Sequence, residues 1–141
     1  MDKLMIKKLL EDTLFAEGKF VFLPEFYEDF EELSHNTGNA KKVINRLLFE
    51  LNAIIQLNNC DCGPTWLEHL KEYGNMYSLH IDTQFENYRI LFSKDSYNKI
   101  FLHMFFEKAG KGKTSYGSHV PIAKERMKNY LKGKDKNEYC E

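Results

Sequence analysis

The chain has no long apolar run, and no hydrophobic stretch approaches the ~20 residues that a membrane-spanning helix needs. Its first residues, MDKLMIKKLLED, also lack the apolar core and the small-residue cleavage site of a secretory signal. These absences argue against a membrane protein and against export. We therefore expect a cytoplasmic protein with no membrane partner.

Cysteine is scarce, with three in 141 residues. An odd number without an export signal argues against a disulfide framework. Cys60 and Cys62 form a CxC pattern, but no second Cys/His pair accompanies them at the spacing of a zinc site. The stretch GKGKTS at 110–115 is not a phosphate-binding loop, because Glu107 occupies the position of the first glycine. The sequence thus predicts neither a metal site nor a cofactor.

Neither sign of charge is in large excess, and the net charge of −1 does not by itself indicate a nucleic-acid binder. The charges are unevenly distributed, however. Residues 1–60 carry ten acidic and seven basic side chains, whereas residues 107–136 carry nine basic and three acidic ones. A basic C-terminal quarter is typical of an electrostatic footprint for RNA, although a solvated helix and tail would give the same pattern.

The chain does have enough apolar side chains for one folded domain, at 43% apolar and 14% aromatic residues. We divide it into a helical N-terminal extension (1–18), a folded domain (19–133) and a mobile tail (134–141). No internal repeat or interdomain linker interrupts the domain.

Residues 40–57 carry the strongest helical pattern, with an apolar stripe formed by Val43, Ile44, Leu47, Leu48, Leu51, Ile54 and Ile55. The full predicted order is a helix at 3–16, a strand at 19–23, helices beginning at Pro24 and spanning 40–57, strands at 76–82, 88–93 and 100–106, and a helix from Ser118 to Gly133. Closely spaced strands favour an antiparallel meander. The predicted fold is α+β: a helix pair packed on an antiparallel sheet of about four strands, with a C-terminal helix.

Strand alternation sorts the side chains of the three later strands between two faces. The core face is predicted to hold Tyr77, Leu79, Ile81, Tyr88, Ile90, Phe92, Ile100, Leu102 and Met104. The opposite face then presents His80, Arg89 and His103, with Phe101 and Phe105 alongside. A Lys-rich turn bearing Lys108, Lys111 and Lys113 follows the last strand.

These residue types meet the chemical needs of RNA cleavage without a metal. A base must take the proton of the 2′-hydroxyl, and an acid must protonate the leaving 5′-oxygen. Histidine suits both tasks because its unperturbed pKa is about 6.5. Arginine suits the phosphate because its planar fork donates two hydrogen bonds to it. The lysines can hold neighbouring phosphates, and aromatic rings can stack on unpaired bases.

Three sequence patterns, in this order and spacing, resemble a known family. They are YRILF at 88–92, IFLHMFFEK at 100–108 and AKERMKNYL at 123–131. They resemble the Tyr-Arg-apolar strand, the Leu-His-x-Phe-x-Lys-Lys strand and turn, and the closing Ala-x-x-Arg helix of the RelE/HigB-like bacterial toxins. The resemblance covers about residues 19–131.

The resemblance implies a RelE-like fold and a ribosome-dependent, metal-independent endoribonuclease that cleaves mRNA and inhibits translation. It implies the ribosome, mRNA and a cognate antitoxin as partners. Arg89 would act on the scissile phosphate, with His80 and His103 completing the catalytic set. Lys108, Lys111, Lys113 and Arg126 would contact RNA.

Two other interpretations remain open at this stage. One is a binding protein on the same fold: either a gyrase inhibitor, as the related ParE-like toxins are, which cut no RNA, or a non-catalytic relative that binds only a partner. The other is a plain α+β domain with an unrelated role.

Overall fold

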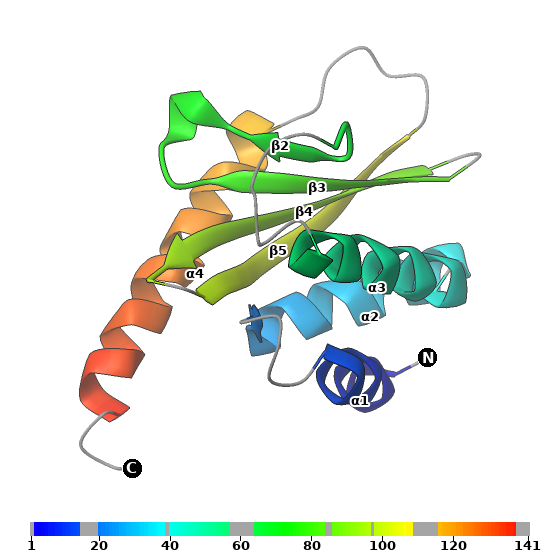
Figure 1. Ribbon diagram of the computed structural model, residues 1–141, viewed down its shortest axis with the longest axis horizontal. Helices are drawn as coiled ribbons and strands as arrows, with labels where there is room; N and C mark the ends of the chain where they lie inside the picture. Colours follow the sequence, from blue (N-terminus) through cyan, green and yellow to red (C-terminus); the bar gives the residue numbers. More distant parts are fainter. Residues whose placement is uncertain are drawn as a thin grey trace.

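The computed structural model describes residues 2–14, 20–38, 40–56, 64–83, 86–96, 98–108 and 116–137. Figure 1 shows the elements in chain order: α1 (Lys3–Leu14), β1 (Phe20–Phe22), α2 (Pro24–Thr37), α3 (Ala40–Gln56), β2 (Leu67–His69), a short 3-10 helix η1 (Lys71–Tyr73), β3 (Tyr77–Asp82), β4 (Glu86–Asp95), β5 (Asn98–Lys108) and α4 (Tyr116–Asn137). The predicted α+β class is confirmed.

The strands form one five-stranded sheet in the order β1-β5-β4-β3-β2. β1 runs parallel to β5, and the other neighbouring pairs are antiparallel. The prediction of about four antiparallel strands is therefore wrong in count and in the direction of one edge strand. β2 is only three residues long, and the parallel pair joins Phe20 to Lys99, far away in sequence. No local pattern encodes such a pairing.

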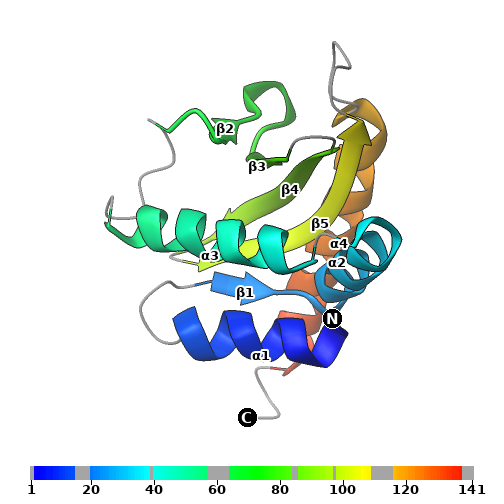
Figure 2. The same ribbon diagram turned by 90° about the vertical axis from the view of Figure 1, so that its right-hand side faces the viewer.

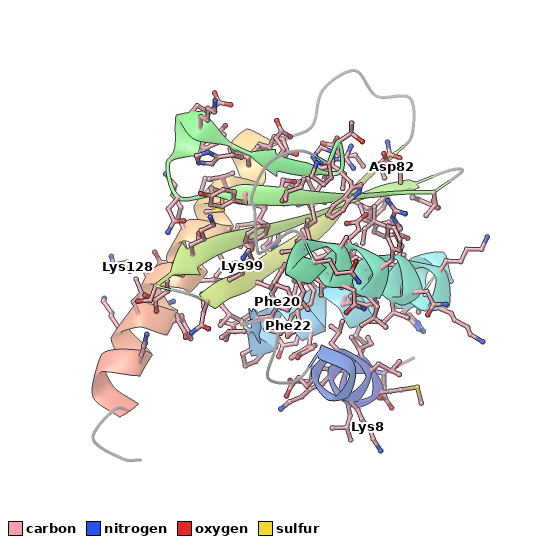
Figure 3. The ribbon with its side chains drawn as sticks, viewed as in Figure 1. Lys8, Phe20, Phe22, Asp82, Lys99 and Lys128 are labelled. Carbon is pink, nitrogen blue, oxygen red and sulfur yellow. The ribbon has the colours of Figure 1, made fainter. Side chains whose placement is uncertain are left out.

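Helices cover both faces of the sheet, with α2 and α3 on one face and α4 on the other (Figure 2). The larger hydrophobic cluster lies under α2 and α3 and includes Phe26, Leu51 and Ile90. The smaller cluster lies under α4 and includes Leu91, Phe105, Val120 and Ala123. Phe20 and Phe22 of β1 pack against the larger cluster (Figure 3).

α1 lies within the region predicted as an N-terminal extension, and it packs on α2 and α3. Ile6 and Leu10 are fully buried and belong to the larger hydrophobic cluster. The opposite face of the helix exposes Leu4, Met5 and Leu9. α1 therefore contributes to the same core as the helix pair.

A β-bulge in β5 changes which side chains face which helices. Leu91 pairs with His103 and Phe92 pairs with Phe101, so Leu102 is an extra residue between them. An extra residue breaks the two-residue period of a strand, and the side chains that precede it change face relative to strict alternation.

The face prediction for β5 is therefore wrong on one side of the bulge. Phe101 packs in the cluster under α2 and α3, whereas Ile100 and Leu102 pack in the cluster under α4. Beyond the bulge, Met104 lies in the larger cluster and Phe105 in the smaller one, as the alternation predicts.

α4 is longer at both ends than its sequence pattern predicts. It begins at Tyr116, two residues before Ser118, and continues past Gly133 to Asn137. Glycine lowers helix propensity but keeps the N–H and C=O groups that a helix needs, so it does not by itself end one. Lys134, at the start of the predicted tail, pairs with Asp95 at 2.7 Å. Residues 138–141 lie outside the described residues.

Glu50 is an ionisable side chain in the core, fully buried on the sheet-facing side of α3. Its Oε2 accepts a hydrogen bond from Arg46 Nε at 2.9 Å, and its Oε1 has no partner among the described residues. Burial raises the pKa of Glu50 from 4.5 to about 8, and the charge of Asp82 acts in the same direction. At neutral pH the folded protein thus holds a proton on Glu50 that the unfolded chain releases.

We expect Glu50→Gln to stabilise the protein increasingly as the pH rises from 5 to 8. Between the unfolded and folded pKa values, proton linkage lowers wild-type stability at a rate approaching ~1.4 kcal/mol per pH unit, and a neutral amide removes this dependence. The measurement is the difference in free energy of unfolding between variant and wild type across this range. The lowered pKa values of His80 and His119 make stability rise with pH in the acidic part of the range. This contribution is the same in variant and wild type, so it cancels in the difference. Glu125→Gln on α4 is the exposed control, and a pH-independent difference for Glu50→Gln would contradict the prediction.

Candidate catalytic site

The sheet face under α4 carries two of the predicted catalytic residues side by side. His80 of β3 and Arg89 of β4 are cross-strand partners. His103 of β5 lies on the same face, opposite Leu91. The N-terminal turns of α4 cover this region and add Tyr116 and His119, which are three residues apart and therefore lie on one side of the helix.

Around His80 lies a set of side chains that we call the His80 group: His80, Glu68, Ser78 and Tyr116, which are linked by hydrogen bonds, and Arg89, the strand partner of His80. His80 Nε2 lies 3.1 Å from Tyr116 Oη and 3.2 Å from Glu68 Oε1. Tyr116 Oη also lies 3.0 Å from Ser78 Oγ. Burial and then the charge of Arg89 lower the pKa of His80, whereas burial raises the pKa of Tyr116 to about 12. At neutral pH the imidazole is therefore neutral and the phenol keeps its proton.

Arg89 is buried, with 8% of its surface exposed. Its Nη1 donates to Asp82 Oδ1 at 2.9 Å and to the carbonyl oxygen of Tyr88 at 3.0 Å. Asp82 ends β3 and is itself largely exposed (Figure 3). The Nε of Arg89 is buried and has no hydrogen-bond partner among the described residues. A buried donor without an acceptor is costly, so this guanidinium has an N–H that can still donate to a further acceptor, such as an anionic oxygen.

A second set, which we call the Asp29 group, joins α2, β5 and α4: Asp29, His103, His119 and Arg126. Asp29 Oδ2 lies 3.0 Å from His103 Nδ1 and accepts hydrogen bonds from Arg126 Nη1 at 2.6 Å and from the Met104 N–H at 3.1 Å. Burial alone would raise the pKa of Asp29, but the bonds from His103, Arg126 and Met104 outweigh it and hold the pKa below its usual value. Asp29 is therefore ionised at neutral pH.

Phe105 lies between the two groups. Its ring stacks on His119 with centroids 3.7 Å apart and an interplanar angle of 5°, and it meets Tyr116 edge-on at 6.2 Å. Phe105 is also the cross-strand partner of Arg89. Arg89, Tyr116 and His119 are thereby gathered around one aromatic ring.

The structure separates some residues that the sequence analysis had grouped. His103 belongs to the Asp29 group and not to the His80 group. Arg126 Nη1 donates to Asp29 and to the carbonyl oxygen of Leu102 at 2.9 Å, and its contact with RNA stays a prediction. Its geometry supports a role inside the protein. Lys108 ends β5, and Lys111 and Lys113 lie outside the described residues.

Sequence reasoning missed the residues that α2 and α4 bring to this face. Tyr116 fits a packing role by its pattern, and neither Asp29 nor His119 stands out in a local motif. One feature of the sequence could have indicated them: Tyr116 and His119 are three residues apart at the start of a basic helix, so their side chains share one side of it. This spacing points to the site only when the position of the helix over the strands is known.

Within the part of the chain that the structure describes, no three His, Cys, Asp or Glu side chains are arranged to hold a metal ion. Cys60, Cys62 and Cys140 lie outside that part. None of the described helices combines the length and apolar character needed to cross a bilayer. In comparisons with known proteins, no family model, no curated protein and no solved structure matches the chain.

Proposed function

We propose that the protein is an endoribonuclease toxin of the RelE/HigB type, which cleaves mRNA on the ribosome without a metal and is held inactive by a cognate antitoxin. The observation that carries the proposal is the pairing of His80 with Arg89 on adjacent strands, beneath Tyr116. The sequence patterns at 88–92, which includes Arg89, and at 100–108 and 123–131 also support it.

Arg89 is the group proposed to stabilise charge on the phosphate. When the 2′-oxygen attacks phosphorus, negative charge builds up on the non-bridging oxygens. The guanidinium of Arg89 is the proposed donor to such an oxygen, and its Nη1 is already oriented by Asp82. A guanidinium held in a poorly solvated position exerts a stronger effect than one in water.

Tyr116 is the group proposed to protonate the leaving 5′-oxygen. Its phenol keeps its proton at neutral pH because burial raises its pKa to about 12. His80, at 3.1 Å, and Ser78, at 3.0 Å, hold the hydroxyl in place, and both are positioning residues in this scheme. Cleavage then breaks the P–O5′ bond and leaves a 2′,3′-cyclic phosphate and a free 5′-hydroxyl.

The test is induced expression of the chain, with primer extension on a reporter mRNA. We expect growth arrest together with new 5′ ends inside translated codons. Blocking initiation on the reporter should remove the cuts, because the proposed substrate is mRNA held by the ribosome. Growth arrest with intact mRNA and with DNA damage would replace the proposal by gyrase inhibition, and arrest with neither would favour a non-catalytic binding protein.

A further inference from the structure

The Asp29 group holds two imidazoles in direct contact, and its geometry fixes where their protons lie. His103 Nε2 is 2.8 Å from His119 Nδ1, and His103 Nδ1 is 3.0 Å from Asp29 Oδ2. Arg126 Nη1 also approaches His103 Nδ1, at 3.1 Å. The question is which of these nitrogen atoms carries a hydrogen.

The hydrogen count of Arg126 answers it. Nη1 has two hydrogens, and they are used by Asp29 Oδ2 at 2.6 Å and by the Leu102 carbonyl oxygen at 2.9 Å. None remains for His103 Nδ1, so this nitrogen carries its own hydrogen and donates to Asp29. In neutral His103, Nε2 is then an acceptor and receives the Nδ1 hydrogen of His119. Among the described residues nothing donates to Nε2 of His119, which carries the lone pair of this neutral ring.

His119 is also placed where such a lone pair is useful. Its ring is partly exposed and stacks on Phe105, the strand partner of Arg89. No described residue bonds its Nε2. The titratable and charged groups facing the ring are His103 and Glu107 of β5, with Asp29 of α2 and Arg126 behind them. Burial and then His103 lower the pKa of His119, so the imidazole is neutral at pH 7.

We propose that His119 is a catalytic general base, held by an Asp29–His103–His119 relay, that takes the 2′-hydroxyl proton of an RNA substrate. This inference rests on the proposed ribonuclease function and assigns to it a residue outside the three sequence patterns. His119 Nε2 accepts the proton as the 2′-oxygen attacks phosphorus. Asp29 stabilises the resulting positive charge through His103, and both are positioning residues. Tyr116 gives its proton to the 5′-oxygen, so one proton enters the protein and one leaves it.

The first test is independent of RNA. Nitrogen-15 NMR of the uniformly labelled full-length protein at pH 7 reads the tautomer of each histidine. We expect a hydrogen on Nδ1 and none on Nε2 for both His103 and His119. A hydrogen on His119 Nε2 would overturn the inference and leave the proposed ribonuclease untouched.

The second test measures single-turnover cleavage of ribosome-bound mRNA against pH, for wild type, His119→Gln and His119→Ala. Loss of a general base is expected to lower the rate by about 10²-fold or more and to remove the acidic limb of the pH–rate profile. Added imidazole should restore cleavage by His119→Ala, which a purely structural role would not allow. His35→Gln, at an exposed histidine of α2, is the matched control.

The outcomes separate the two proposals. Unchanged rate and pH profile in both His119 variants, with cleavage lost in an Arg89 variant, would overturn the role of His119 alone. Absence of cleavage by the wild type would overturn the ribonuclease and this inference together. If His119→Ala does not fold, the pH–rate profile of His119→Gln is the test: loss of the acidic limb supports the inference, and an unchanged profile overturns it.

Discussion

Arg89→Ala is expected to lower mRNA cleavage by at least ~100-fold and so to abolish toxicity, because loss of one preorganised donor to a charged transition state has effects of that size. The reason is specific to this position. Arg89 has a buried Nε with no partner in the described part of the chain, and it lies directly beside His80 and Phe105. Primer extension on a reporter mRNA, combined with the growth rate after induction, measures the result.

The controls for this prediction separate charge from packing. Arg89→Met keeps most of the buried volume and should be as inactive as Arg89→Ala, with a smaller loss of stability. Lys128→Met removes a positive charge from an exposed position on α4 and should leave cleavage unchanged. The proposed site would be wrong if both Arg89 variants folded and cut mRNA at the wild-type rate.

Phe101→Ala is expected to destabilise the fold by about 4 kcal/mol, within the range for loss of a buried phenylalanine. Phe101 is fully buried and lies within 6.1 Å, between ring centroids, of Phe20, Phe22, Phe26 and Phe92. It therefore joins β1, α2 and β4 through one side chain. A typical domain is stable by only about 5–15 kcal/mol, so the loss should be evident in urea denaturation.

Phe106→Ala is the matched control on the same strand. Phe106 is 41% exposed, and its removal should cost about 1–2 kcal/mol, clearly less than removal of Phe101, because less apolar surface is buried there. Equal destabilisation by the two substitutions would contradict the position of Phe101 at the centre of the larger cluster.

Sequence patterns predicted the helices and strands in which apolar residues recur at a regular spacing. The apolar stripe of 40–57 corresponds to α3, and Pro24 is the first residue of α2. The three later strands also lie where alternation placed them. β2 and the direction of β1 could not be predicted in the same way, because both depend on partners elsewhere in the chain. The β5 bulge could not be predicted either, because strict alternation gave no sign that Leu102 is an extra residue.

The residues of the candidate site also fall into those that the sequence predicted and those that it did not. The strand residues His80, Arg89 and His103 could be assigned to one face from alternation alone. Each histidine turns out to lie behind a residue of α4: His80 behind Tyr116, and His103 behind His119. The placement of a helix over a sheet is a tertiary property, so the sequence indicated the inner residues and not those that cover them.

The parallel pairing of β1 with β5 sets an order of events during protein synthesis. Phe20–Phe22 leave the ribosomal exit tunnel long before Lys99–Phe101, their partners, have been made. During that interval α1, α2 and α3 can cover their apolar faces only with one another. Pairings between residues far apart in sequence form slowly, and β5 must enter between β1 and β4 to complete the sheet. Since α4 follows β5, the face that carries Arg89 and His119 cannot assemble until residues 116–137 have been made as well.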